Sequence, residues 1–428
     1  MIKQLKSNLK QNQNLRVAYR ELYHAWRQIS VFLFVFYLKK IKFKTVTRKQ
    51  LTDNKSKFDV QEFSSAEKVN FGKFSSSKTI PERITKKVYP MQVEIVQPFV
   101  CIIKQAEIIG NFPVAFDLEG NLILETTLPR FTSIEAHIAK NVSIKTIITS
   151  QLGKKSQGSA IEVACILTNP WSNNFWHWTV DTLTQLEGVE YYQQQTGIKP
   201  KLIVDHNLRS WQKESLRLLG YETTDLIIWQ DFRRTVEELI VPSFRRSYDD
   251  KKNGCVEEIH GEISIAACQW LKAKMLSNLT KIASNSQEDS ISFSPKVFIS
   301  RRKALGRRIT NENEVLEVLQ PLGFSTYILE EMSYTQQVKL FAQAKVIVAP
   351  HGAGLTNLIF AERPIILELF GAYVGREFAN LARGMGYKYG CLGCPPPPGE
   401  VRQKDGDLVV NVNDLLNLLG EMEDGDLE

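Results

Sequence analysis

Cysteine is too scarce in this chain to form a disulfide framework. Six cysteines are spread over 428 residues, and four of them stand alone in the sequence. Cys391 and Cys394 form a C-x-x-C pair, but a zinc site needs further ligands and no second pair lies nearby. We therefore expect buried, reduced thiols, because a free cysteine packs like a small hydrophobic residue.

Long apolar runs are missing as well. The only candidate membrane segment, Ile29–Leu38, is far shorter than the roughly 20 residues that span a bilayer. Its aromatic residues and basic flanks are typical of a segment that lies in a membrane interface, and a helix docked on the protein's own surface is the alternative. No small-residue cleavage site of a secretory signal is present. We expect a cytoplasmic protein that can contact the inner face of an anionic membrane peripherally.

Acidic residues are scarce at the front of the chain. Residues 1–90 hold 20 Lys and Arg but only 6 Asp and Glu, a net charge of +14, whereas the whole chain carries +7. Such a segment attracts anionic lipid or nucleic acid. It shows no recognisable nucleic-acid-binding motif and the remaining residues are net acidic, so we expect no nucleic-acid partner. Residues 45–90 are polar, which indicates a linker or a loosely ordered extension.

The apolar pattern predicts an α/β fold. From Val93 to Ser150, short apolar runs alternate with turn signals, which is typical of partly antiparallel strands. From Ile161 onward strands alternate with helices, including one helix over about 174–195, as in βαβ units with parallel strands. The last third repeats this alternation in a Rossmann-like pattern, with strands predicted at Lys296–Ser300, Ser325–Leu329, Val346–Ala349 and Ile365–Leu369.

The glycine-rich turn in the last third lacks two familiar signatures. Gly352-Ala353-Gly354 is neither the G-x-G-x-x-G of dinucleotide binding nor part of a G-K-[ST] P-loop. Hydride transfer and ATP hydrolysis therefore have no support from these motifs.

Polar residues nevertheless collect where the predicted strands of the last third end. Ligands of parallel sheets bind at the carboxyl ends of the strands. Arginine binds phosphate bidentately, and backbone amides at a helix N-terminus favour an anion. We predict a nucleotide diphosphate site, with Glu368 accepting hydrogen bonds from the ribose; its members are Arg301, Arg302, Arg308, His351, Gly352, Ala353, Gly354, Thr356, Asn357 and Glu368. A solvated basic face is the alternative.

A second constellation follows the predicted strand Ile161–Leu167. His177 and Asp181 are four residues apart, so they share one face of a helix. A carboxylate beside an imidazole fixes its tautomer, and the pair can deprotonate a hydroxyl as general base. Asn174, Trp176 and Trp178, together with Trp171, are candidates for binding an acceptor sugar. The alternative is a structural role, in which a partly buried histidine makes its hydrogen bonds within a core of aromatic residues.

The two constellations, in this order, resemble glycosyltransferase family 61. The similar stretches are Asn174–Asp181, Ile299–Arg302, Arg308-Ile309 with Asn311-Glu312, Ala349–Asn357 and Ile366–Phe370, within residues 160–390. The resemblance implies an inverting transfer of a sugar from a nucleotide-sugar donor to a glycan acceptor on a two-lobed GT-B architecture. It further implies a role in capsular or extracellular polysaccharide synthesis.

Together these observations give a domain hypothesis. We predict a basic, partly disordered or membrane-associating extension over 1–90 and an acceptor-side α/β lobe over 91–284. A nucleotide-sugar-binding Rossmann-like lobe follows over 285–428. His177 is the expected base, oriented by Asp181, and His351 is the alternative base or a phosphate ligand. No cofactor or metal is expected to be required. A non-catalytic nucleotide-sugar or polysaccharide-binding protein on the same scaffold is the rival interpretation.

Overall fold

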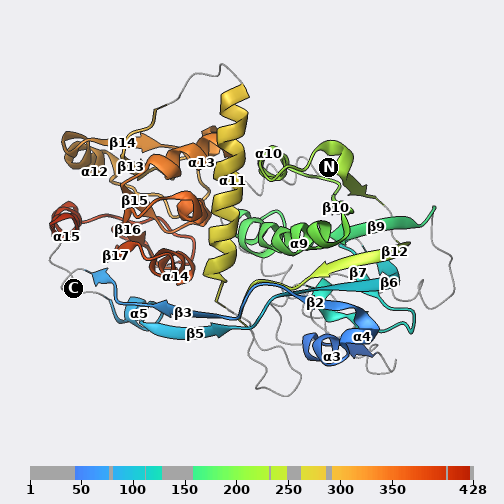
Figure 1. The fold of residues 1–428 in the computed structure, drawn as a ribbon. Coiled ribbons are helices and arrows are strands. Elements are labelled where there is room, and N and C mark those ends of the chain that lie inside the picture. Colours follow the sequence, from blue (N-terminus) through green and yellow to red (C-terminus); the bar gives the residue numbers. More distant parts are fainter. Residues whose placement is uncertain are drawn as a thin grey trace, which may run out of the picture.

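The computed structural model describes residues 44–76, 81–110, 112–127, 158–230, 233–247, 262–285, 292–401 and 403–424. Two β-sheets with flanking helices organise these residues (Figure 1). The predicted α/β class is therefore confirmed. The predicted domain boundaries at residues 90 and 284 stay predictions.

The first sheet is half antiparallel and half parallel. Its order, over the described residues, is β1-β8-β7-β6-β12-β9-β10-β11, with β2 paired to β6. The strands are β1 (Thr45–Val46), β2 (Val60–Glu62), β6 (Phe99–Ile109), β7 (Val114–Phe116), β8 (Leu122–Ile123), β9 (Ile161–Ile166), β10 (Lys201–Asp205), β11 (Leu226–Trp229) and β12 (Arg233–Pro242). Strands β12, β9, β10 and β11 run parallel, whereas β12–β6 and β6–β7 pair antiparallel, as the sequence predicts.

The helix predicted over 174–195 is interrupted. It consists of α8 (Phe175–His177), a π-helical turn over Trp178–Thr182, a 3₁₀ turn over Leu183–Gln185 and α9 (Leu186–Thr196). Buried polar side chains in the wide turn find partners outside the helix: Arg246 donates to Asp181, and Asn169 donates to the Thr182 hydroxyl over 3.2 Å. Single π turns of this kind are frequent at functional sites.

The second sheet is parallel throughout the described residues, in the order β14-β13-β15-β16-β17-β4. The predicted alternation of strands and helices is confirmed. The elements are β4 (Ser75–Ser76), β13 (Lys296–Ile299), α12 (Glu312–Leu319), β14 (Phe324–Tyr327), α13 (Tyr334–Gln343), β15 (Val346–Pro350), a 3₁₀ helix (Ala353–Phe360), β16 (Ile365–Phe370), α14 (Glu377–Gly384), β17 (Lys388–Gly393) and α15 (Val412–Glu423). A capping box starts α13, because the side chains of Ser333 and Gln336 each accept from the other's backbone amide.

The interpretation of residues 45–90 as a linker or loosely ordered extension is wrong for the described part. These residues form α3 (Arg48–Asp53), α4 (Lys55–Phe58), β3 (Glu67–Phe71), α5 (Glu82–Thr85) and strands β1, β2 and β4, and β3 pairs with β5 (Met91–Ile95). The segment is polar on average, but its few apolar side chains are used fully: Leu51, Phe71 and Ile84 have no exposed surface. A single buried apolar side chain, such as these three in α3, β3 and α5, is enough to dock a short element on a larger core.

Helix α11 (Ile265–Asn285) stands between the two sheets (Figure 1). Its N-terminus is capped by Glu67 of β3, whose carboxylate accepts from the amides of Ile265 and Ala266. Lys272 donates to the carbonyl of Ala361 on the side of the second sheet, and Lys274 pairs with Glu190 of α9 on the side of the first. The helix therefore ties the two halves together.

Two further expectations concern the cysteines and the membrane. The five cysteines among the described residues are buried free thiols, as expected. The part of the chain that the structure describes contains no helix long and apolar enough to cross a membrane. Ile29–Leu38 lies outside that part.

Candidate active site

The two predicted constellations come from different sheets and meet through aromatic side chains. Trp176 follows β9, and its indole packs edge-on against Phe378 of α14, with ring centres 5.2 Å apart. Phe378 in turn lies 5.1 Å from the ring of His351, which directly follows β15. Residues at the carboxyl ends of strands from both sheets thus lie close together, as predicted for the two constellations.

On the side of the first sheet, His177, Asp181 and Arg246 form one buried chain of contacts. The Nδ1 atom of His177 lies 2.7 Å from one carboxylate oxygen of Asp181, and the other oxygen accepts from Nε of Arg246. These side chains are between 1% and 6% exposed. Asp181 holds the imidazole through Nδ1, so Nε2 is the ring nitrogen that can exchange a proton with a ligand.

On the side of the second sheet, His351 makes a similar contact with a different third partner. Its Nδ1 lies 2.5 Å from Oε1 of Glu368, and Oε2 of Glu368 accepts from the hydroxyl of Tyr389 over 2.6 Å. Burial, and secondarily the charge of Glu368, holds the pKa of Tyr389 well above its ordinary value, so the hydroxyl remains a donor. The imidazole packs among the rings of Phe370, Tyr373 and Phe378.

This arrangement corrects the role predicted for Glu368. Both of its oxygens are engaged and the residue has no exposed surface. Glu368 therefore orients His351 and is not available to ribose hydroxyls.

Arg301 lies against the glycine turn, and not all of the N–H groups of its guanidinium have a hydrogen-bond partner. Its Nη2 donates to the carbonyl of Gly306 over 3.2 Å, whereas its buried Nε has no hydrogen-bond partner. A Cβ added at Gly352 would lie 2.1 Å from Nη1 of Arg301, so the turn needs glycine for the guanidinium to approach. Burial, and next the neighbouring charge of Arg307, lowers the pKa of Arg301, as expected for two cations that share one site.

Arg307, and not the predicted Arg308, contacts the backbone beside the glycine turn. Its Nη1 donates to the carbonyl of His351 over 3.3 Å, and its guanidinium lies 5.7 Å from the ring of Tyr373. Its Nε lies 3.9 Å from a carboxylate oxygen of Asp405. Arg307 takes a left-handed backbone conformation with φ of 56°, which turns its side chain toward the glycine turn.

The prediction that Arg308 binds the donor stays a prediction, and its charge is already paired in this structure. Its guanidinium is half exposed and pairs with Asp407 over 2.6 Å. Arg302 is similarly engaged, with the hydroxyl of Ser300 and the carboxylate of Glu312. Both charges are thus offset by partners on the surface.

Thr356 and Asn357 stabilise the turn from within. Both are fully buried; the Thr356 hydroxyl donates to the carbonyl of Ala353, and the Asn357 amide donates to Gln337 and to the carbonyl of Gly354. A Cβ at Gly354 would lie 2.6 Å from the Leu329 side chain. These residues fix the shape of the turn, and the predicted direct contact of Thr356 and Asn357 with a ligand is not supported by their burial.

The predicted acceptor residues divide into structural and accessible ones. Trp178 is 1% exposed, packs on Trp211 and donates to the hydroxyl of Ser215, so the prediction that sugars stack on it is wrong. The Asn174 side chain caps α8 by accepting from the amide of His177. Trp176 is buried against Phe378 with its indole N–H unpaired, and the half-buried Trp171 lies 5.5 Å from the His177 ring.

Sequence reasoning missed Arg246, Arg307 and Tyr389. Arg246 comes shortly after β12, so the rule about carboxyl ends of strands could have found it. Arg307 directly precedes the predicted Arg308, and its left-handed backbone conformation distinguishes it from that neighbour. Tyr389 lies inside a strand, and no local signal marks it.

Among the described residues no group of three or more His, Cys, Asp or Glu side chains is placed to hold a metal ion.

The similarity to known proteins covers most residues of both constellations. Residues 175–366 match the model of the family described as Glycosyltransferase 61, and this match confirms the predicted resemblance. Among individual proteins, the chain is similar to the EGF domain-specific O-linked N-acetylglucosamine transferase of Gallus gallus, with 28% identity over 100 residues, 22% of this chain and 19% of the relative. It is also similar to Beta-1,2-xylosyltransferase RCN11 of Oryza sativa subsp. japonica, with 24% identity over 218 residues, 47% of this chain and 38% of the relative.

The matched region therefore spans well under half the length of these relatives.

Proposed function

We propose that this protein is a glycosyltransferase that moves a sugar from a nucleotide-sugar donor to a glycan hydroxyl with inversion. The observation that carries the donor site is the pair Arg301 and Arg307 beside Gly352. Arg301 is largely buried, has an unpaired Nε and experiences the charge of Arg307. A diphosphate would supply the missing negative charge and accept the unused N–H.

The proposed chemistry assigns one step to each side of the crevice. His177 takes the proton of the acceptor hydroxyl at Nε2, and the hydroxyl oxygen forms the new bond to the anomeric carbon of the donor. The bond from that carbon to the phosphate oxygen breaks, and the nucleoside diphosphate leaves with its electron pair. Arg301, Arg307 and the amides around Gly352 stabilise the charge on the leaving group.

The family similarity and the two sheets support a GT-B architecture, in which donor and acceptor bind between two lobes. We further propose that no resident metal is required, that the chain acts in capsular or extracellular polysaccharide synthesis, and that it is cytoplasmic with peripheral membrane contact. Transfer that persists in excess EDTA would support the metal-independent proposal, and transfer abolished by EDTA and restored by Mg²⁺ or Mn²⁺ would overturn it.

The donor site can be tested by thermal unfolding with UDP, GDP, CDP and ADP. A diphosphate at 100-fold excess over its Kd adds about 2.7 kcal/mol to the free energy of unfolding. We expect one diphosphate to raise the Tm of the wild type and of Arg308→Ala, but not that of Arg301→Ala. Arg308 is the matched control because it pairs with Asp407 on the surface.

Two results would overturn the proposal. If no diphosphate stabilises the folded wild type, or if Arg308→Ala alone loses the effect, the donor site is misplaced.

The rival function is a non-catalytic binding protein on the same scaffold. It would need the arginines and the glycine turn, but not the ordered contact of His177 with Asp181 and Arg246. Hydrolysis of the donor by the wild type in the absence of acceptor, lost in His177→Ala, would exclude it.

A further inference from the structure

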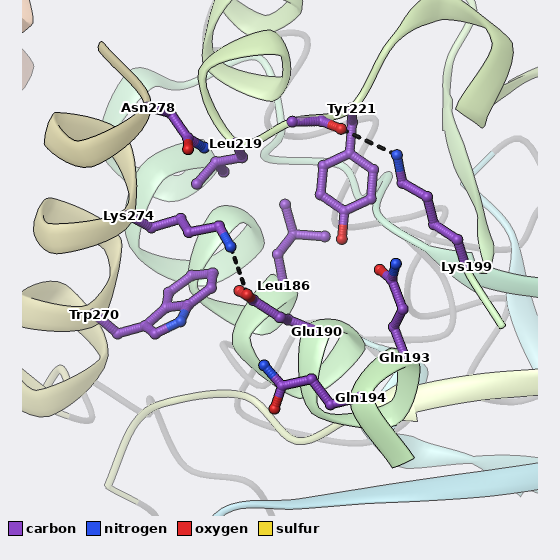
Figure 2. Close-up of a pocket in the computed structure, with 11 residues that line it drawn as sticks. Leu186, Glu190, Gln193, Gln194, Lys199, Leu219, Tyr221, Trp270, Lys274 and Asn278 are labelled. Atoms are coloured by element: carbon purple, nitrogen blue, oxygen red, sulfur yellow. Dashed lines mark hydrogen bonds and ion pairs between the residues drawn. The ribbon is translucent and has the colours of Figure 1, made fainter. Parts of the chain in front are cut away.

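A cavity of about 430 Å³ lies outside the crevice and uses no residue of either histidine network. It is lined by α9, by α11 and by the loop that follows α10 (Ser210–Leu218) (Figure 2). Its walls are Leu186, Glu190, Gln193, Gln194, Lys199, Leu219, Gly220, Tyr221, Trp270, Lys274 and Asn278. The volume falls in the range of about 300–1,000 Å³ that is typical of small-molecule pockets.

The two helices present polar faces to each other across this cavity. Trp270, Lys274 and Asn278 follow one another at four-residue spacing, so they lie on one face of α11. Glu190 and Gln194 are likewise four residues apart on α9. Neighbouring helices usually bury apolar faces against each other, whereas these polar faces leave room between them in which a polar ligand can bind.

The charges in the cavity are already offset. Lys274 pairs with Glu190 over 2.5 Å, and Lys199 pairs with Asp225 over 2.6 Å and donates to the carbonyl of Gly220. A phosphate or carboxylate ligand would have to compete with these carboxylates. The chemistry therefore favours a neutral ligand.

The uncharged groups are those that bind sugars. Figure 2 shows the indole of Trp270 at one wall and the hydroxyl of Tyr221 pointing toward the middle, with the amide of Gln193 beneath it. Amides and hydroxyls can exchange hydrogen bonds with sugar hydroxyls. The flat indole and the side chains of Leu186 and Leu219 can cover the apolar face of a pyranose ring.

We propose that this cavity is a second carbohydrate-binding site, which holds a neutral sugar unit of a glycan away from the point of transfer. Lys199 and Tyr221 lie in the loops that lead into β10 and β11, at the amino ends of these strands. The crevice lies at the carboxyl ends. The site would thus bind a distant part of the acceptor or of the product, and this assignment of its role rests on the proposed function.

The test measures binding of defined oligosaccharides by isothermal titration and saturation-transfer NMR. The probes are the neutral tetrasaccharides of glucose, mannose, xylose and N-acetylglucosamine, with a sulfated heparin tetrasaccharide as the anionic probe. We expect at least one neutral probe to bind the wild type with a Kd of about 1 mM or tighter. Gln194→Trp, which places a large side chain at the rim, should weaken this binding at least about tenfold.

Gln195→Trp is the matched control, because Gln195 is exposed, adjacent on α9 and outside the cavity lining. It should bind the probe as the wild type does. The proposal is overturned if no neutral probe binds, if only the sulfated probe binds, or if the two variants behave alike. Diphosphate stabilisation measured on the same preparations keeps the two proposals apart. Sugar binding without diphosphate binding would support the cavity site and contradict the donor site. Diphosphate binding without sugar binding would support the donor site and contradict the cavity site.

Discussion

The two buried histidines differ in what holds their carboxylate. Asp181, which holds His177, also accepts from the guanidinium of Arg246, so its charge is offset without the histidine. Glu368, which holds His351, accepts from the neutral hydroxyl of Tyr389, and its recorded ion pair among the described residues is with His351 alone. A histidine that is not needed as counter-ion is suited to accept a proton. His351 directly follows β15 and precedes the glycine turn, so it is placed to lie beside the phosphates of a donor.

The comparison is tested most strongly by removing each imidazole in turn. We expect His177→Ala to lower kcat by about 10²–10⁴-fold, the usual contribution of a general base, while diphosphate binding persists. His351→Ala should weaken diphosphate binding instead. Steady-state kinetics and titration with the diphosphate measure both effects. If His351→Ala lowers kcat with full diphosphate affinity and His177→Ala does not, the two roles are exchanged.

Adding a methyl group at the glycine turn should weaken diphosphate binding beside His351 without changing the contacts of His177. Gly352→Ala places its Cβ where the Arg301 guanidinium lies, so the side chain must move. We expect diphosphate affinity to fall by about 10–100-fold, which corresponds to losing one charge-assisted contact. Gly420→Ala in α15 is the control, because nothing lies within 4 Å of its added Cβ. Equal affinities in both variants would show that Arg301 is not a donor ligand.

The substitution Arg246→Lys tests whether Arg246 helps Asp181 to orient His177. Lysine keeps the charge but loses the planar contact with Asp181, so the imidazole of His177 is less well oriented. We expect kcat to fall about tenfold with an unchanged KM for the donor, and the pH profile of kcat to shift. A fall in stability with an unaltered pH profile would indicate that Arg246 serves the fold and not the base.

Tyr389→Phe should have the smallest effect. It removes one donor from the buried Glu368 and leaves the ring in place, so we expect a loss of about 1–3 kcal/mol in the free energy of unfolding. Denaturant titration measures it. A stability equal to that of the wild type would mean that Glu368 finds another partner when the hydroxyl is removed.

The sequence predicts elements better than it predicts the direction of side chains. The predicted alternation of strands and helices in the last third is confirmed, because most elements there bury a group of apolar side chains. The break in the helix after His177 escapes prediction, since it depends on contacts of Asp181 with Arg246, 65 residues away. Which arginine faces the turn was likewise invisible, because Arg307 and Arg308 differ only through backbone conformation and the position of Asp407.

Polarity also misled the interpretation of residues 45–90. An average over the segment hides that Leu51, Phe71 and Ile84 are separate anchors, each buried in a different element. Trp178 shows the opposite error, since an aromatic residue in a functional motif can belong wholly to the core.

The short strand β4 has a consequence for how the chain is made. Ser75 and Ser76 pair with Gly390 and Cys391 at the border of the second sheet, so the sheet takes its last strand from the early part of the chain. At about 5–20 residues per second, a ribosome needs on the order of tens of seconds to add the intervening residues. During synthesis β4 therefore exists long before its partner, and this edge of the sheet can pair only after β17 has been made.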